Sequence, residues 1–175
     1  MIKAFYPDHY VKSAYDIPYE ELYKNGIRGL LFDIDNTLVE HGKPATEQAI
    51  ALMKRLKKIG FKICLISNNK EARVKMFNEE IQVEYVYKAG KPKRSGYLAA
   101  MGRLATNAHT TVFVGDQLFT DVWGAKRTGI ETYLVEPIDK HEEIQIVLKR
   151  YLEKPILYCY KKQQNRFGRL KREGK

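Results

Sequence analysis

The chain has 175 residues, of which 44% are hydrophobic and 30% are charged, so it can form one domain with a buried core. This composition excludes a collagen-like or wholly disordered chain, and two cysteines are too few for a secreted fold held by disulfides. The sequence also lacks a membrane-spanning apolar run and the apolar stretch of a signal peptide, so we expect a cytoplasmic protein. The net charge of +10 is compatible with nucleic acid, an anionic membrane or a phosphorylated substrate as partner.

Short apolar runs alternate with helical patterns along the middle of the chain. Five of these runs have the length and β-branched content of buried parallel strands: residues 29–34, 61–66, 83–87, 111–114 and 131–135. Strands that are separated by helices predict right-handed crossovers. We therefore expect an α/β fold with three layers, Rossmann-like, with a mainly parallel five-stranded sheet.

Three segments have the apolar spacing of amphipathic helices. The first covers residues 49–59 and is followed by a stop signal in Gly60, and the second begins after Ser95. The third is defined by apolar residues at helical spacing, Ile144, Val147, Leu148, Tyr151 and Leu152. We expect Pro155 to end this third helix, because proline lacks the backbone N–H that a helix interior needs.

The positive charge is concentrated in two segments. Residues 161–175 contain seven Lys or Arg and one Glu, and residues 88–94 contain four basic residues and no acid. No repeat or linker divides the rest, so we assign residues 1–160 to a single domain and residues 161–175 to a basic C-terminal tail. Two interpretations of the tail stay open. It is either solvated, with the tyrosine-rich terminal segments packed on the domain, or part of an aromatic and basic surface that contacts an anionic bilayer.

Acidic residues follow two of the predicted strands, where ligands bind in sheets of this type. Asp33 and Asp35 come at the end of the first strand, and alternate residues of a strand point the same way, so both could face one site. Asp116 and Asp121 follow the fourth strand. Four clustered carboxylates would repel one another, and a divalent cation would relieve the repulsion. Oxygen-only ligands favour Mg²⁺.

The ends of two other strands supply the remaining groups of a phosphoryl-transfer site. Ser67 adds a hydroxyl group and Lys91 adds an ammonium group. A carboxylate can attack phosphorus and form an acyl phosphate, while cations stabilise the charge on the phosphoryl oxygens. A second carboxyl group can then transfer protons to the leaving oxygen and from water.

Four motifs in this order resemble those of the haloacid dehalogenase-like (HAD) phosphatases. The D-x-D-x-T motif after an apolar strand is present in LLFDIDNTL, residues 30–38, and the strand that ends in a hydroxyl residue is CLIS, at Ser67. The lysine before a helix is Lys91 in AGKP, and G-D-x-x-x-x-D covers residues 115–121. The resemblance implies the HAD fold and a phosphatase that hydrolyses phosphomonoesters with Mg²⁺.

The resemblance also implies catalytic roles by position. Asp33 would be the nucleophile, and Asp35 would be the general acid and base. Ser67 would hydrogen-bond the phosphoryl group, and Lys91 would stabilise the phospho-aspartate and its transition states.

The same resemblance implies a set of metal ligands. Asp33 and Asp116 would bind Mg²⁺ directly, and Asp35 would contribute its backbone carbonyl. Asp121 would act directly, through water or by orienting Lys91. An alternative for Asp121 is that it only caps the helix that follows it.

Four further residues are candidates for substrate binding: Thr37, Asn68, Lys93 and Arg94. Thr37 could instead shape the turn after the first strand, and Asn68 could simply satisfy the backbone of its loop. Lys93 and Arg94 belong to the basic segment of residues 88–94, which suits a phosphorylated substrate.

The intervals between the motifs are too short for the cap domain that covers small substrates in many HAD enzymes. Only 29 residues separate Thr37 from Ser67, and 23 separate Ser67 from Lys91. An open site excludes water poorly unless a bulky substrate or a partner surface covers it. The stretch PDHYVKSAYDIPYEELYKNGIRGLLFDIDNTL, residues 7–38, gives a finer resemblance, to the capless subfamily IIIA and its bacterial YqeG group. This group is similar to the mitochondrial-type phosphatidylglycerophosphatases.

The leading hypothesis is therefore a Mg²⁺-dependent phosphatase that acts on a lipid phosphate, peripherally at the inner face of the membrane. One alternative is a soluble HAD phosphatase that acts on nucleotides, nucleic-acid ends or phosphoproteins. A second is a basic HAD-like module that binds RNA and has only vestigial activity. Nucleic acid is the less favoured partner, because the tail has only Phe167 for base stacking and a full acidic cluster is costly to keep unused.

Overall fold

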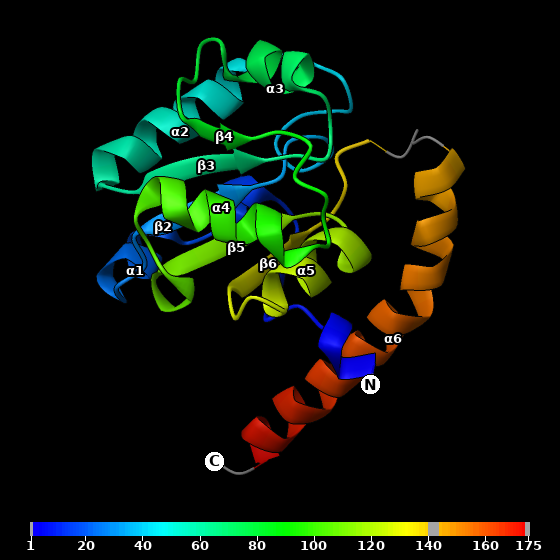
Figure 1. Cartoon of the computed structure of the whole chain (residues 1–175). Helices are drawn as coiled ribbons and strands as arrows, with labels where there is room; N and C mark the ends of the chain where they lie inside the picture. Colours follow the sequence, from blue (N-terminus) through cyan, green and yellow to red (C-terminus); the bar gives the residue numbers. More distant parts are fainter. Residues whose placement is uncertain (1, 140–143, 174–175) are drawn as a thin grey trace.

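A computed structural model describes residues 2–139 and 144–173 of the chain (Figure 1). Its centre is a parallel sheet with the strand order β1-β6-β5-β2-β3-β4. The strands are β1 (His9–Val11), β2 (Gly29–Phe32), β3 (Lys62–Ile66), β4 (Glu84–Val86), β5 (Thr111–Gly115) and β6 (Glu131–Val135). Every neighbouring pair is parallel, so the predicted α/β class and parallel sheet are confirmed.

The predicted number of five strands is wrong, because the N-terminal segment adds a sixth strand, β1. This strand pairs with β6, with Val11 opposite Val135. Its three residues, HYV, are too short and too polar to give a strand pattern. Side chains hold it in place instead, since the Asp8 carboxylate accepts hydrogen bonds from the Thr132 backbone N–H and hydroxyl at 2.9 and 2.8 Å.

Helices cover both faces of the sheet, which confirms the three predicted layers. They are α1 (Tyr19–Lys24), α2 (Glu47–Ile59), α3 (Glu71–Asn78), α4 (Arg94–Leu104) and α5 (Trp123–Lys126). The last helix, α6 (Ile144–Glu173), packs on the outside of these layers, against the segment Leu118–Val122 (Figure 1). Along the buried strand β2, Leu30 and Phe32 pack in a core with α1, α2 and α3, whereas Leu31 packs in a second core with α4 and α5. This alternation is the two-residue period of a strand buried on both faces.

The predicted helix over residues 49–59 is confirmed as α2. The Thr46 hydroxyl accepts a hydrogen bond from the Ala49 backbone N–H at its start, and Gly60 ends it with a left-handed φ of 112°. Residues 33–91 are all described, and between β2 and β4 they form loops, α2, β3 and α3. They contain no inserted cap domain, as predicted.

The expectation that Pro155 ends the last helix is wrong, because α6 continues through it. Contacts of residues after the proline hold this part of the helix against the body. Ile156 packs in a third apolar cluster with Leu118, and the Tyr160 ring lies 5.4 Å from that of Tyr6. These contacts offset the single backbone hydrogen bond that a proline removes from a helix.

Helix α6 runs past the domain boundary that we predicted from the sequence. The backbone of the basic segment stays helical as far as Glu173, and the N-terminus lies against the middle of the same helix (Figure 1). Within the part of the chain that the structure describes, no helix is both long enough and apolar enough to cross a membrane. The division at residue 160 stays a prediction.

Candidate active site

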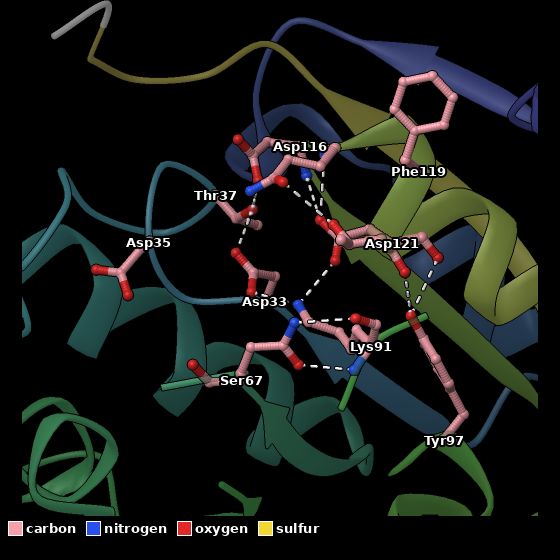
Figure 2. A network of polar contacts seen from close by, with 12 residues as sticks. Asp33, Asp35, Thr37, Ser67, Lys91, Tyr97, Asp116, Phe119 and Asp121 are labelled. Atoms are coloured by element: carbon pink, nitrogen blue, oxygen red, sulfur yellow. Dashed lines mark hydrogen bonds and ion pairs between the residues drawn. The ribbon is translucent and has the colours of Figure 1, made fainter. Parts of the chain in front are cut away.

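The four sequence motifs meet at the carboxyl edge of the sheet (Figure 2). Asp33 directly follows β2, Ser67 follows β3, and Asp116 follows β5. Lys91 lies in the loop between β4 and α4. Because the strands are parallel, their carboxyl ends form one edge, and this edge is where α/β sheets bind ligands.

Lys91 lies at the centre of the site and is almost completely buried, with 3% of its side chain exposed. Its ammonium group donates hydrogen bonds to Asp33 Oδ1 at 2.6 Å and to Asp121 Oδ1 at 2.7 Å. Burial alone would lower the pKa of Lys91, but the charges of Asp121 and Asp33 outweigh burial and raise it above its ordinary value. Lys91 therefore stays positively charged in the interior.

Asp121 links this lysine to the loop after β5. Its second oxygen, Oδ2, accepts hydrogen bonds from the backbone N–H groups of Asp116 and Gln117. These groups precede Asp121 in the chain, and α5 has no side-chain cap, so the capping alternative for Asp121 is not what the structure shows. A Cβ atom at Gly115 would lie 2.6 Å from Oδ2, and the motif therefore needs glycine at this position.

Asp33, Asp116 and Asp121 form a buried triad whose ligand oxygens all lie within 4.8 Å of one another. The Thr37 hydroxyl is within hydrogen-bond distance of both Asp33 and Asp116, at 3.2 and 3.3 Å. Burial raises the pKa of Asp33 to about 6, although Lys91 opposes this effect. Burial also raises the pKa of Asp116 well above its usual range, with Arg150 opposing it. A divalent cation would remove this cost of burying charge, and an all-oxygen donor set fits a hard metal ion.

The structure does not bring the carboxylate of Asp35 to this triad. Its Oδ1 atom accepts hydrogen bonds from Arg73 Nη2 and the Gly42 backbone N–H, both at 2.8 Å, and Oδ2 accepts one from Asn69 Nδ2 at 2.8 Å. Figure 2 shows it pointing away from Asp33. Strand alternation predicted a common direction, but β2 ends at Phe32, so the alternation does not extend to Asp35.

The other candidate residues have different surroundings. Ser67 is buried, and its hydroxyl oxygen accepts a hydrogen bond from the Asn69 backbone N–H. Asn68 holds the backbone of Lys91 from both sides, accepting from its N–H at 2.7 Å and donating to its carbonyl at 3.0 Å. These contacts favour the alternative in which Asn68 supports the loop. Lys93 and Arg94 are exposed at the start of α4, and their role in binding stays a prediction.

Helix α6 supplies two site residues that the sequence analysis missed. The guanidinium of Arg150 forms an ion pair with Asp116 Oδ2 and donates to the Asp116 carbonyl at 2.5 Å. Glu153 is buried, and its carboxylate accepts hydrogen bonds from the Leu118 and Phe119 backbone N–H groups. Burial raises the pKa of Glu153, and Arg150 opposes this effect. The only signal for them in the sequence is that Arg150 and Glu153 are three positions apart in the last predicted helix. They lie on the side opposite its apolar residues, such as Leu148 and Leu152.

Comparison with known proteins agrees with this geometry. The haloacid dehalogenase-like hydrolase family matches residues 47–129. The probable phosphatase YqeG of Bacillus subtilis (strain 168) is 37% identical over 164 residues, covering 93% of this chain and 95% of its own. The chloroplastic/mitochondrial phosphatidylglycerophosphate phosphatase 1 of Arabidopsis thaliana is 27% identical, covering 83% of this chain but only 48% of its own.

Solved structures show the same fold at lower identity. The cobalt-bound deoxy-D-mannose-octulosonate 8-phosphate phosphatase of Haemophilus influenzae superposes with a TM-score of 0.52 at 13% identity, covering 62% of this chain and 67% of its own. The site and these relatives define the class: this chain belongs to the haloacid dehalogenase-like hydrolases. Within that family it is a phosphatase, similar to YqeG along nearly its whole length.

Proposed function

We propose that this phosphatase hydrolyses phosphomonoesters through a phospho-aspartate on Asp33 and requires Mg²⁺. The observation that carries the proposal is the buried ammonium of Lys91, which bridges Asp33 and Asp121 beside Asp116. A cation in this position stabilises negative charge on a phosphoryl group that is bound to Asp33. Mg²⁺ would be held by Asp33 and Asp116, with Asp121 and the Asp35 carbonyl as further ligands, and would neutralise the phosphoryl oxygens.

In the first step of the proposed reaction, a carboxylate oxygen of Asp33 bonds to phosphorus while the ester P–O bond breaks. Asp35 gives a proton to the leaving alkoxide. In the second step Asp35 takes a proton from water, whose oxygen bonds to phosphorus, and phosphate leaves Asp33. Asp35 is held by Arg73 and Asn69 in this structure, so both steps require its side chain to turn toward Asp33.

Ser67 and Thr37 have supporting roles in this proposal. The Ser67 hydroxyl lies at the end of β3 and would donate a hydrogen bond to the phosphoryl group. The Thr37 hydroxyl orients the carboxylates of Asp33 and Asp116. Lys93 and Arg94, exposed near Lys91, would attract the anionic substrate.

We further propose that the substrate is a lipid phosphate, such as phosphatidylglycerophosphate, and that the enzyme acts peripherally at the cytoplasmic face of a membrane. Three observations support this choice. The Arabidopsis relative is a phosphatidylglycerophosphate phosphatase, the site has no cap to enclose a small substrate, and basic residues are concentrated near the site and in α6. Nucleotides, nucleic-acid ends and phosphoproteins are the competing substrates.

The chemistry is tested with an aryl phosphate in the presence of Mg²⁺. Asp33→Asn should abolish phosphate release, because the amide cannot act as the nucleophile, whereas Asp16→Asn, on the exposed surface, should leave it unchanged. Activity that survives Asp33→Asn, or that persists in EDTA, would overturn the mechanism. The substrate is tested by comparing phosphatidylglycerophosphate in mixed micelles with sugar phosphates and nucleotides. Equal turnover of all three would favour the soluble alternative.

A further inference from the structure

Helix α6 has two different faces. Glu153, Ile156 and Tyr160 face the body of the protein and are 2–8% exposed. The opposite face is apolar but uncovered, with Leu148, Tyr151, Leu152 and Tyr158 exposed by 65, 62, 59 and 68%. These four residues and Pro155 are three or four positions apart, so they form one stripe along the helix. We call Leu148, Tyr151, Leu152, Pro155 and Tyr158 the outer stripe.

The outer stripe is unusual for the surface of this protein. The other large hydrophobic side chains that are exposed in the described residues reach at most 49%, at Leu98, and come from separate elements. Single exposed apolar residues are normal, but a contiguous stripe indicates a surface that another structure covers.

Charges around the stripe define what that partner must be. Between Ile144 and Arg172 the only acidic residue is Glu153, which faces inward. Lys154 borders the stripe, and Lys162, four positions after Tyr158, continues its line toward the C-terminus. The Lys154 ammonium lies 4.2 Å from the centre of the Tyr151 ring, which places positive charge directly beside the apolar surface. The partner must therefore offer both apolar surface and negative charge.

We propose that the outer stripe of α6 docks on an anionic lipid bilayer. An interfacial helix combines an apolar face with bordering lysines whose stems lie along the apolar surface while their ammonium groups reach the headgroups. Tyrosine side chains favour the same level of a membrane. A second copy of the chain would bring two cationic helices together, and RNA would leave Leu148 and Leu152 without an apolar partner.

The docked helix also touches the active site from its other side. Arg150 contacts Asp116 from the same turns that carry Leu148 and Tyr151. Docking would therefore place the site about one helix diameter, roughly 10 Å, from the lipid surface. The inference rests on the proposed function, because a lipid phosphate substrate is the reason for the enzyme to bind a membrane. Binding to vesicles is nevertheless measured without turnover.

The test is co-sedimentation of the full chain with vesicles of phosphatidylcholine, with or without phosphatidylglycerol. The wild-type chain should bind the anionic vesicles and should bind neutral ones at least tenfold more weakly. Tyr151→Ser combined with Leu152→Ser should weaken binding to anionic vesicles at least tenfold. The matched control, Leu98→Ser with Met76→Ser, removes two exposed apolar side chains from α4 and α3 and should bind like the wild type. All variants should hydrolyse a soluble aryl phosphate at the wild-type rate.

Equal vesicle binding by the stripe variant and the control would overturn the proposal, as would equally tight binding to neutral vesicles. It would also be overturned if the stripe variant lost RNA binding or self-association while its vesicle binding stayed unchanged. The proposed substrate fails separately. If the chain binds vesicles through the outer stripe but does not hydrolyse phosphatidylglycerophosphate, the docking surface stands and the proposed lipid substrate is wrong.

Discussion

Asp116 is held from two sides that differ in origin. On one side, Thr37 and Asp121 belong to segments that follow the strands β2 and β5 of the sheet. On the other side, Arg150 reaches Asp116 from a helix that packs on the outside of the domain. Thr37 and Asp121 are positioned by the central strands, whereas Arg150 is positioned by the packing of α6 against the body of the protein. The catalytic groups should therefore be sensitive to single changes in the interior, and the contribution of α6 should be smaller and separable.

The largest effect is expected at Lys91. Lys91→Met leaves two buried carboxylates without their cation, so the free energy of unfolding in EDTA should fall by about 3–5 kcal/mol. Hydrolysis of an aryl phosphate should fall at least about 100-fold. The control is Lys93→Met at the surface, which should change stability by less than about 0.5 kcal/mol. Equal stability of the two variants in urea unfolding would contradict the buried ion pair.

Helix α6 should contribute to stability through one face only. Ile156→Ala removes a side chain that is 8% exposed, and should lower the free energy of unfolding by about 2 kcal/mol. Tyr158→Ala, on the outer stripe, should change it by less than about 0.5 kcal/mol in the absence of lipid. If neither variant is destabilised in chemical unfolding, α6 does not pack on the body in the way described.

Arg150 should modulate the metal site without belonging to its chemistry. Its guanidinium forms an ion pair with Asp116. Arg150→Ala removes this positive charge, so the triad becomes more negative and should bind Mg²⁺ up to about tenfold more tightly. Arg150→Lys keeps the charge and should bind Mg²⁺ nearly as the wild type does. Calorimetric titration with Mg²⁺ measures both. Weaker binding by Arg150→Ala would show that Arg150 instead positions Asp116 for the metal.

The smallest effect is expected at the edge strand β1. Burial raises the pKa of Asp8, but its hydrogen bonds with Lys126 and Thr132 outweigh burial and lower the pKa overall. A lowered pKa in the folded state stabilises the protein above the unfolded pKa, about 3.9, and this stability is lost as the pH falls below it. The Asp8 side chain is 36% exposed, so Asp8→Asn should cost less than about 1 kcal/mol at neutral pH.

Urea unfolding between neutral pH and about pH 3 checks this prediction. The difference between the wild type and Asp8→Asn should shrink toward the acid end of the range. Asp16→Asn, an exposed carboxylate on the same terminal segment, serves as the control and should match the wild type throughout. A difference that grows as the pH falls would contradict the assigned sign.

The residues that could be predicted from the sequence share a local cause. Asp33, Lys91, Asp116 and Asp121 lie at fixed offsets from apolar strands, and a parallel sheet brings such positions to one edge. The resemblance to HAD phosphatases then gave these positions their expected roles.

The features that sequence reasoning missed depend on tertiary contacts. Strand β1 is held by Asp8 and Thr132, which lie 124 positions apart in the chain. The direction of Asp35 depends on Arg73, beyond the next strand. The contact of Arg150 with Asp116 depends on which face of α6 packs against the body. The apolar side chains of the helix would predict that the opposite face packs inward. Local spacing contains no information about any of these contacts.

The central claim is that Asp33 carries the phosphoryl group during turnover, and mass spectrometry can test it directly. The enzyme would be quenched in acid during turnover of an aryl phosphate with Mg²⁺, digested, and analysed for phosphorylated peptides. We predict one added phosphoryl group on Asp33, absent in Asp33→Asn, because the buried Lys91 stabilises charge at that carboxylate. A phosphoryl group on a different residue, with Asp33 unmodified, would contradict the account.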